Sequence, residues 1–255
     1  MPSSPTTGRS PLLRPRAFAD FPSVTAGMST RHGGVSGPPY DTLNLGRHVG
    51  DEASCVEENR RRFCAALDTD PAWLATAGQV HGSTVRVIDA PRHEPFCDGL
   101  VTTTPGLLLA IAVADCAAVL LADPTRGVAG ACHAGWRGAV RRIPADTVGT
   151  MADQGAVPAQ IRAYVSPCLS QDAFEVGPEV AEQFDDAVVA RPDGADRPYV
   201  DLRASVRRQL EGAGVPSDTI EVSDRCTMQE TDHFFSHRAT EGSTGRMFGA
   251  IVLRH

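Results

Sequence analysis

The most constraining feature of the sequence is an apolar stretch, residues 106–122 (GLLLAIAVADCAAVLLA), which is interrupted by one charged residue, Asp115. The uninterrupted part, Leu107–Ala114, is far shorter than the roughly 20 residues that a membrane-spanning helix needs. An Asp at the centre of a membrane helix would also cost about 3 kcal/mol on insertion scales. The stretch therefore predicts two buried strands on either side of a polar turn, and not a membrane span.

The second of these strands leads into a predicted hairpin. Ala118–Ala122 and Val128–His133 flank the sequence DPTRG, whose residues favour a turn. In an antiparallel hairpin centred on Thr125, Cys116 lies about as far before the turn as His133 lies after it. The hairpin therefore predicts that these two side chains meet at its open end, within the usual uncertainty of one or two residues in register.

Apolar residues at three- to four-residue spacing predict helices outside this hairpin. Three are expected over residues 51–67, 179–190 and 201–213, the first and the third capped by an Asp. A fourth follows Gly138, and Pro144 must start or kink it. We expect a single α/β domain with a mixed sheet, whose further strands cover residues 84–88, 107–113, 161–165, 219–223 and 248–253.

The charged residues exclude several kinds of protein. All 24 basic side chains are Arg, against 31 acidic ones, for a net charge of −7. The acidic balance argues against general binding to nucleic acids or membrane surfaces. Without Lys there is no Walker-A loop and no Schiff-base enzyme. Anions must instead be bound by guanidinium groups, which hold phosphate or carboxylate in a planar fork.

The cysteines and the first residues indicate a cytoplasmic protein. Seven Cys, an odd number without a framework spacing, are typical of free thiols in a reducing compartment. Residues 1–16 are rich in Pro, Ser and Thr and lack the apolar core of a secretory signal. We expect residues 1–16 to form a disordered tail and residues 17–255 to form one catalytic domain.

Three short segments contain side chains that can bind a metal. They are Gln79-Val80-His81-Gly82, Ala114-Asp115-Cys116 and residues 133–138 (HAGWRG). Taken singly, a Cys in an apolar run is typical of a core, and a His beside Gly is typical of a turn. Taken together, His81, Cys116 and His133 would suit Zn²⁺ with a fourth position left open, as in catalytic zinc sites.

These segments resemble one known family. QVHG, ADC and HAGWRG match the YfiH-type laccase-domain family, whose members are described as polyphenol oxidases and as purine nucleoside enzymes. One departure is Ala239, where the family usually has a second Arg after Arg238. The resemblance runs over nearly the whole chain, through STRHGGVSGPPYDTLNLGRHVGD, DGLVT, SPCLSQDAFEVG, VDLR and FFSHRATEGSTGR.

The resemblance implies a fold, a metal and an activity. The implied fold is a four-layer α-β-β-α stack, with mixed sheets in the centre and helices packed outside. The implied metal ligands, which are also catalytic residues, are His81, Cys116 and His133, holding Zn²⁺ or, as the alternative ion, Cu²⁺. The implied activity is cleavage of adenosine, inosine and methylthioadenosine by phosphate, with adenosine deamination in addition. Zinc suits deamination because it lowers the pKa of bound water. Hydroxide is then available at neutral pH to attack purine C6.

Further site residues are expected near these ligands. Asp115 either handles the proton of the attacking water or caps a turn. Asn44 either binds ribose or base or lies in a turn, and Asp98 is equally ambiguous. The expected phosphate ligands, each with a surface ion pair as the alternative, are Arg31, Arg137 and Arg238.

Other functions remain open at this point. Copper-dependent phenol oxidation is attributed to the same family, although one copper is poorly equipped for the four-electron reduction of O₂. Cys116 could instead be a nucleophile with His133 as its base, in a hydrolase or an editing factor for peptidoglycan precursors. The fourth hypothesis is a non-enzymatic binding module that contains a structural zinc. We expect a monomer that binds a small nucleoside and phosphate, without nucleic acid or membrane.

Overall fold

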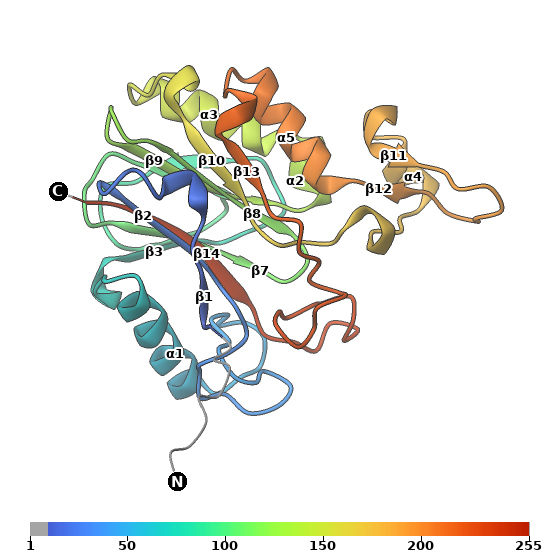
Figure 1. The fold of residues 1–255 in the computed structure, drawn as a ribbon. Helices are drawn as coiled ribbons and strands as arrows, with labels where there is room; N and C mark the ends of the chain where they lie inside the picture. Colours follow the sequence, from blue (N-terminus) through green and yellow to red (C-terminus); the bar gives the residue numbers. More distant parts are fainter. Residues whose placement is uncertain (1–9, 255) are drawn as a thin grey trace, which may run out of the picture.

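The structure, a computed structural model, describes residues 10–254 and contains two six-stranded sheets (Figure 1). The first sheet has the order β1-β2-β14-β7-β3-β5 and the second the order β13-β10-β8-β9-β6-β4. The strands of the first sheet are β1 (Leu12–Leu13), β2 (Val24–Ser29), β14 (Met247–Leu253), β7 (Leu108–Val113), β3 (Leu74–Ala77) and β5 (His93–Glu94). Those of the second are β13 (Ile220–Val222), β10 (Arg162–Val165), β8 (Ala117–Asp123), β9 (Val128–Ala134), β6 (Gly99–Thr102) and β4 (Val85–Val87).

Helices cover the outer faces of the two sheets (Figure 1). An additional pair of short strands, β11 (Val189–Ala190) and β12 (Tyr199–Val200), lies in a segment that projects from the main body beside α4. None of the helices within residues 10–254 is long and apolar enough to cross a membrane. The α-helices are α1 (Ala53–Ala66), α2 (Trp136–Val140), α3 (Ile143–Asp153), α4 (Pro178–Ala181) and α5 (Leu202–Gly212).

Three apolar clusters fill the spaces between four layers. One lies between the sheets and joins Leu109 of β7 to Leu120 of β8. A second lies between α1 and the first sheet, where Phe63 packs edge-on against Phe248. The third lies between the second sheet and the helices α2, α3 and α5, and contains Met151. The expected α-β-β-α stack is confirmed, and every interface is closed by apolar side chains.

The apolar stretch 106–122 forms two buried strands, as predicted, and each strand belongs to a different sheet. β7 lies in the first sheet and β8 in the second. Asp115 lies between them with φ +86°, a left-handed conformation that reverses the chain within a few residues. Cys116 therefore lies where the chain passes from one sheet to the other.

The predicted hairpin is β8–β9, and its register differs by one residue from the predicted one. His133 pairs with Ala118 and Ala134 pairs with Ala117. Extending this register by one residue puts Cys116 opposite Gly135, just beyond the paired ends. The open end of the hairpin thus brings Cys116 and His133 together, as the sequence predicted.

Two predicted helices are confirmed with small changes. α1 begins at Ala53 with Glu52 as its N-cap, one residue later than predicted, because the Asp51 carboxylate bonds instead to Ser36 and Asn44. α5 begins as predicted, since the Asp201 side chain accepts a hydrogen bond from the Ala204 N–H.

The region after Gly138 contains a break between two helices. α2 ends at Val140, and Arg142 adopts a left-handed φ of +64° before α3 begins at Ile143. Pro144 lies in the first turn of α3, where its missing N–H costs no hydrogen bond. The predicted fourth helix is therefore present, as α2 and α3.

The prediction of a helix over residues 179–190 is wrong. α4 is a single turn, and the chain then forms a short 3₁₀ turn over Asp186–Val188, capped by the Asp185 carboxylate. Val189 and Ala190 pair with Val200 and Tyr199. An internal cap and this strand pairing outweigh the helical spacing of the apolar residues.

The expected tail over residues 1–16 is also too long. Leu12 and Leu13 form β1 and pair with Ser29 and Met28 of β2. Leu12 packs into the cluster under α1, so its burial holds this segment on the domain. Residues 1–9 lie outside the part of the chain that the structure describes.

Candidate active site

The three predicted metal ligands lie together at one end of the second sheet. Cys116 and His133 come from the open end of the hairpin, and His81 comes from the loop between β3 and β4. The rings of His81 and His133 are 5.0 Å apart, edge to face. A Cβ on Gly135 would lie 2.9 Å from Cys116 Sγ and 3.5 Å from His133 Nε2. The thiol and the ring nitrogen therefore border the same small space, and glycine at position 135 keeps it open.

Asp98 joins the two histidine-bearing segments. Its side chain is fully buried, and its Oδ1 lies 2.9 Å from His133 Nδ1. The same carboxylate accepts hydrogen bonds from the backbone N–H groups of Val80, His81 and Gly82, at 3.1, 3.0 and 2.8 Å. With Nδ1 engaged by a carboxylate, Nε2 is the nitrogen left for another partner, as in many metal-binding histidines.

The loop that carries His81 is held in an uncommon backbone conformation. Gln79 and His81 have φ of +55° and +59°, which costs about 1–3 kcal/mol per residue and is frequent at functional sites. The Gln79 side chain fixes the loop to the first sheet, because it donates to the Ala112 carbonyl and accepts from the Ala112 N–H, at 2.6 and 2.8 Å. The loop is therefore attached to both sheets, through Gln79 on one side and Asp98 on the other.

The two histidines have opposite electrostatic environments. Burial opposes the charged form of His133, but the Cys116 thiol and the Asp98 carboxylate outweigh it and raise the pKa of His133 to about 9. The pKa of His81 is lowered, first by burial and then by repulsion from His133. The direction of the shift favours a proton on His133, and metal binding at this place competes with that proton.

The donor chemistry of the cluster suits a soft or borderline cation. Two imidazoles and a thiol are common ligands of zinc and copper, and Asp98 is the kind of outer partner that orients such ligands. Within residues 10–254, no three His, Cys, Asp or Glu side chains are gathered closely enough to count as a formed metal site. The residues thus fit a metal by type and by neighbourhood.

Asp115 holds other parts of the chain rather than pointing freely into the cluster. It is buried, and its Oδ1 accepts from the Thr227 hydroxyl at 2.7 Å. Its Oδ2 accepts from the Arg238 backbone N–H at 2.6 Å. Each oxygen therefore accepts a hydrogen bond from a residue far away in the chain, which is neither of the two roles predicted for Asp115, and its part in catalysis stays a prediction.

Two predicted substrate ligands are also engaged by the chain itself. Arg31 donates to the carbonyls of Asp41 and Thr231 and forms an ion pair with Asp41 at 3.1 Å. Asn44 is fully buried, and its amide bonds to Gly46, Asp51 and the Arg246 N–H. The Asn44 amide has no donor or acceptor left for a ligand in this arrangement, whereas each Nη of Arg31 keeps one N–H without a partner in the described chain.

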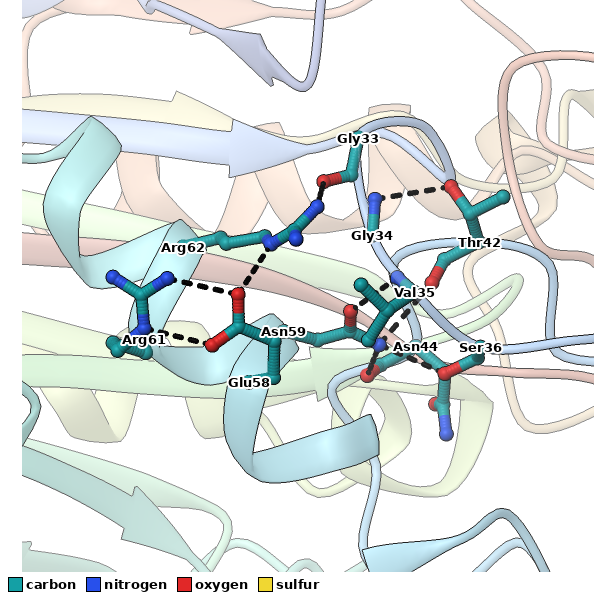
Figure 2. A network of polar contacts seen from close by, with 10 residues as sticks. All are labelled: Gly33, Gly34, Val35, Ser36, Thr42, Asn44, Glu58, Asn59, Arg61 and Arg62. Carbon is teal, nitrogen blue, oxygen red and sulfur yellow. Dashed lines mark hydrogen bonds and ion pairs between the residues drawn. The ribbon is translucent and has the colours of Figure 1, made fainter. Parts of the chain in front are cut away.

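Asn44 belongs to a wider polar network beneath α1. Figure 2 shows Asn59 of α1 donating to Ser36 Oγ and to the carbonyls of Thr42 and Asn44, while its own oxygen accepts from the Val35 N–H. This network fixes the 33–45 loop against the helix. It supplies the structural reason for a buried Asn at position 44.

The other two arginines predicted to bind phosphate, Arg238 and Arg137, differ in whether their guanidinium groups are hydrogen-bonded. The Arg238 guanidinium donates to the Glu175 carbonyl and lies 5.5 Å from the Phe174 ring, in the direction of the projecting segment. Arg137 is exposed, and its guanidinium stacks 4.3 Å over Trp136 and has no hydrogen bond or ion pair with any described residue. Its charge helps to lower the pKa of His81, so Arg137 has a free guanidinium close to the cluster.

Arg246 is a site residue that the sequence reasoning missed. Met247 pairs with Val113, so Arg246 lies opposite the residue that precedes Asp115 and Cys116. Within the described chain only its Nη1 is hydrogen-bonded, to two backbone carbonyls. Burial lowers the pKa of Arg246, and attraction to Cys116 and Asp115 partly offsets this effect. The available signal was its place at the end of the matched segment FFSHRATEGSTGR.

Comparisons with known proteins show the family of the chain. Residues 25–254 match a family model described as multi-copper polyphenol oxidoreductase laccase. The chain is 44% identical to a purine nucleoside phosphorylase of Deinococcus radiodurans, covering 95% of this chain and 93% of that protein. It is 41% identical to the purine nucleoside phosphorylase YfiH of Escherichia coli K12, covering 90% and 94%.

Solved structures share the same fold. The chain superposes on YlmD from Geobacillus stearothermophilus with a TM-score of 0.89 and 32% identity, over 98% of each chain. It superposes equally on a YfiH protein from Bacillus licheniformis, with a TM-score of 0.89 and 33% identity, over 96% of this chain and 97% of that one. The two-sheet architecture is therefore common to these proteins.

Proposed function

The chain belongs to the laccase-domain family described as multi-copper polyphenol oxidoreductase laccase, and we propose that it acts as a metal-dependent purine nucleoside phosphorylase. Relatives with that activity in their names match nearly its whole length. The observation that carries the proposal is the cluster around Asp98, in which a carboxylate orients His133 and the His81 loop beside Cys116. The substrates we propose are adenosine, inosine and methylthioadenosine.

His81, Cys116 and His133 are the residues that would hold the metal, with zinc as the ion we propose. When bound, such a cation supplies Lewis-acid chemistry, which polarises oxygen atoms and makes water more acidic. Asp98 keeps His133 Nδ1 occupied and so directs Nε2 toward the thiol. Gln79 and Asp98 together keep His81 from swinging away with its loop.

Phosphate binding falls to the arginines whose donors are free. In phosphorolysis an oxygen of inorganic phosphate bonds to ribose C1′ while the C1′–N9 bond breaks, and the purine leaves with the bonding electron pair and takes up a proton. The phosphate therefore has to be held against C1′. Arg137 has an unengaged guanidinium near His81, and Arg246 has unengaged Nε and Nη2 groups near Cys116. Their forks suit a phosphate oxyanion.

Adenosine deamination is the second activity that we propose for this site. There a water oxygen adds to purine C6, and the C6 amino group leaves as ammonia. The reaction needs an acidified water but no phosphate. The two activities can therefore be separated by omitting phosphate from the assay.

A second candidate function is favoured by one specific feature. Cys116 lies beside His133, whose other nitrogen bonds to Asp98, and this is also the arrangement of a nucleophile, its base and an orienting acid. A cysteine hydrolase with this site would form a covalent acyl intermediate on Cys116. A metal would then inhibit it by occupying the thiol.

The deciding experiment is product analysis with the zinc-loaded protein. Inosine with phosphate should yield hypoxanthine and ribose 1-phosphate, and adenosine without phosphate should yield inosine and ammonia. Arg137→Ala should raise the KM for phosphate more than the KM for inosine. Arg126→Ala, at the exposed far turn of the hairpin, is the matched control and should change neither. Absence of any purine product at every metal loading would reject the proposal.

The metal itself is tested separately. Metal analysis of protein purified without added copper should find zinc at about one ion per chain. Copper in that preparation, together with O₂-dependent phenol oxidation, would instead favour the hypothesis of a copper-dependent phenol oxidase.

A further inference from the structure

A second cavity lies apart from the candidate active site, between the helices that cover the second sheet. It has a volume of about 570 Å³ and is bounded by the end of α2, by Arg142, by one face of α5 and by the segment 183–188. This volume is within the range of about 300–1,000 Å³ that is usual for small-molecule sites. None of the residues predicted for the active site lines it.

The charges around this cavity leave one cation without a partner. Asp185 forms an ion pair with Arg208 at 3.3 Å, and Glu211 forms one with Arg207 at 2.9 Å. Arg142 also borders the cavity, and its guanidinium has no hydrogen bond or ion pair with any residue in the described range 10–254. The cavity is therefore positively charged at the Arg142 side, which favours an anionic ligand.

Arg142 is also held in a backbone conformation that disfavours its side chain. Its φ of +64° is left-handed, where glycine is favoured and a long side chain costs free energy. The residue separates α2 from α3, and a glycine would serve that break better. A strained Arg at the edge of a cavity is the kind of outlier from which a function can be inferred.

The rest of the lining is partly apolar, through Phe184 and Val188. Gln209 donates from Nε2 to the Ala139 carbonyl at 2.8 Å, and the same carbonyl accepts from the Arg142 N–H, so this side chain ties α5 to the end of α2. The lining thus offers a cation beside an apolar surface.

From these features we propose that the cavity binds a small organic phosphate of about the size of a nucleoside monophosphate. The phosphate contacts Arg142, and the organic part packs against Phe184 and Val188. The ligand also contacts the helix that follows the candidate active site. Gln209 is bonded to the last turn of α2, whose first turn carries Arg137. A Cβ on Gly138 would lie 3.2 Å from the Gly82 carbonyl in the His81 loop, so α2 packs closely on that loop.

The test measures ligand binding to the full chain by calorimetry. The probes are adenosine 5′-monophosphate, ribose 5-phosphate, adenosine and inorganic phosphate. The two organic phosphates should bind more tightly than either adenosine or inorganic phosphate. The difference between the two shows whether the base adds to the affinity that the sugar phosphate provides.

Arg142→Gly is the decisive variant because it removes the guanidinium and relieves the left-handed backbone. It should melt at or above the wild-type temperature, yet weaken binding of the organic phosphate by at least about tenfold. Arg126→Ala removes a charge elsewhere and should bind as the wild type does. Arg137→Ala, in the candidate active site, should leave this affinity unchanged.

Equal affinity in Arg142→Gly and wild-type protein would overturn the proposal, as would a loss confined to Arg137→Ala, which would assign the ligand to the active site. Tryptophan fluorescence gives an independent readout, since Trp136 begins α2 and the chain has one other Trp, at position 73. In Trp73→Phe protein, the organic phosphate should change the Trp136 emission, and Arg142→Gly should abolish that change.

Discussion

Asp98 has more influence on the candidate active site than any predicted ligand, because it contacts both histidine-bearing segments and yet faces no solvent. Four hydrogen bonds converge on one carboxylate: three from loop N–H groups and one from an imidazole. Such partners of metal ligands set ring orientation and ligand basicity. Residue-scale predictions therefore concern Asp98 and the thiols.

Asp98→Asn should lower zinc affinity by about 10- to 100-fold, because the amide no longer orients His133 as a negative acceptor. Competition with a chromophoric chelator measures this change. The matched control is Asp123→Asn, at the other end of the same hairpin. The Asp123 carboxylate is equally buried and accepts backbone N–H bonds from Thr125, Arg126 and Val157. Equal zinc affinity in the two variants would contradict the role given to Asp98.

Alkylation of the native metal-free protein at pH 8 should modify Cys55 and Cys116, which are partly exposed. Burial raises the pKa of Cys64 and Cys97 to about 11, and that of Cys132 to about 12, so these thiols stay neutral and protected at that pH. Zinc should protect Cys116 while Cys55 continues to react, which makes Cys55 the internal control. Mass spectrometry of the peptides gives the pattern. If Cys116 reacts equally with and without zinc, the result favours the hypothesis of a cysteine hydrolase.

Elements built from local signals could be predicted from the sequence. The Asp201 cap and the spacing of its apolar residues were enough for α5, and the turn residues DPTRG were enough for the β8–β9 hairpin. The segment 179–190 has a similar apolar spacing, yet its outcome depended on an internal cap and a distant strand partner. The local sequence pattern contains no information about such distant partners.

In the candidate site, too, some residues could be predicted from local sequence and others could not. Cys116 and His133 could be brought together by the hairpin alone. The roles of Asp98 and Arg246 depend on contacts between residues far apart in the chain, and spacing does not show these. Arg31 was predicted because a guanidinium fork suits an oxyanion, and Asn44 because its amide could bond ribose or base. Their hydrogen bonds in the described chain stabilise the loop beneath α1, and a contact with a ligand stays a prediction.

The element most dependent on buried polar contacts is α1. Asn59→Ala should destabilise the protein by about 3 kcal/mol, because it leaves the Val35 N–H and several buried oxygens without a partner (Figure 2). Urea denaturation measures this loss. Arg61→Ala, on the exposed side of the same helix, removes only an ion pair with Glu58 and should leave the midpoint almost unchanged. Similar midpoints for both variants would contradict the importance of the network.

For the whole molecule, the distance between the two sheets depends on a single glycine. A Cβ on Gly249 of β14 would lie 2.6 Å from the Ala118 Cβ of β8, so the sheets have no room for a methyl group there. Both neighbours belong to backbone-paired strands and cannot rotate away. The two sheets therefore approach each other closely next to the hairpin that carries Cys116 and His133.

Gly249→Ala should lower the free energy of unfolding by about 1–3 kcal/mol through overpacking. Gly149→Ala is the counterpart: it lies on the exposed face of α3 with no atom within 4 Å of the new methyl group, and it should raise stability by about 1 kcal/mol. Thermal and urea unfolding of both variants give the comparison. A Gly249→Ala protein as stable as the wild type would show that the sheets can move apart freely.

β14 lies between β2 and β7, although it follows every other described element in the chain. Until β14 is made, β1 and β2 have no strand to pair with in the rest of the first sheet, so that sheet can be completed only after all its other strands exist. A truncation before β14 removes the middle of a sheet rather than its edge, so we expect the truncated product to be degraded instead of accumulating as a shortened protein.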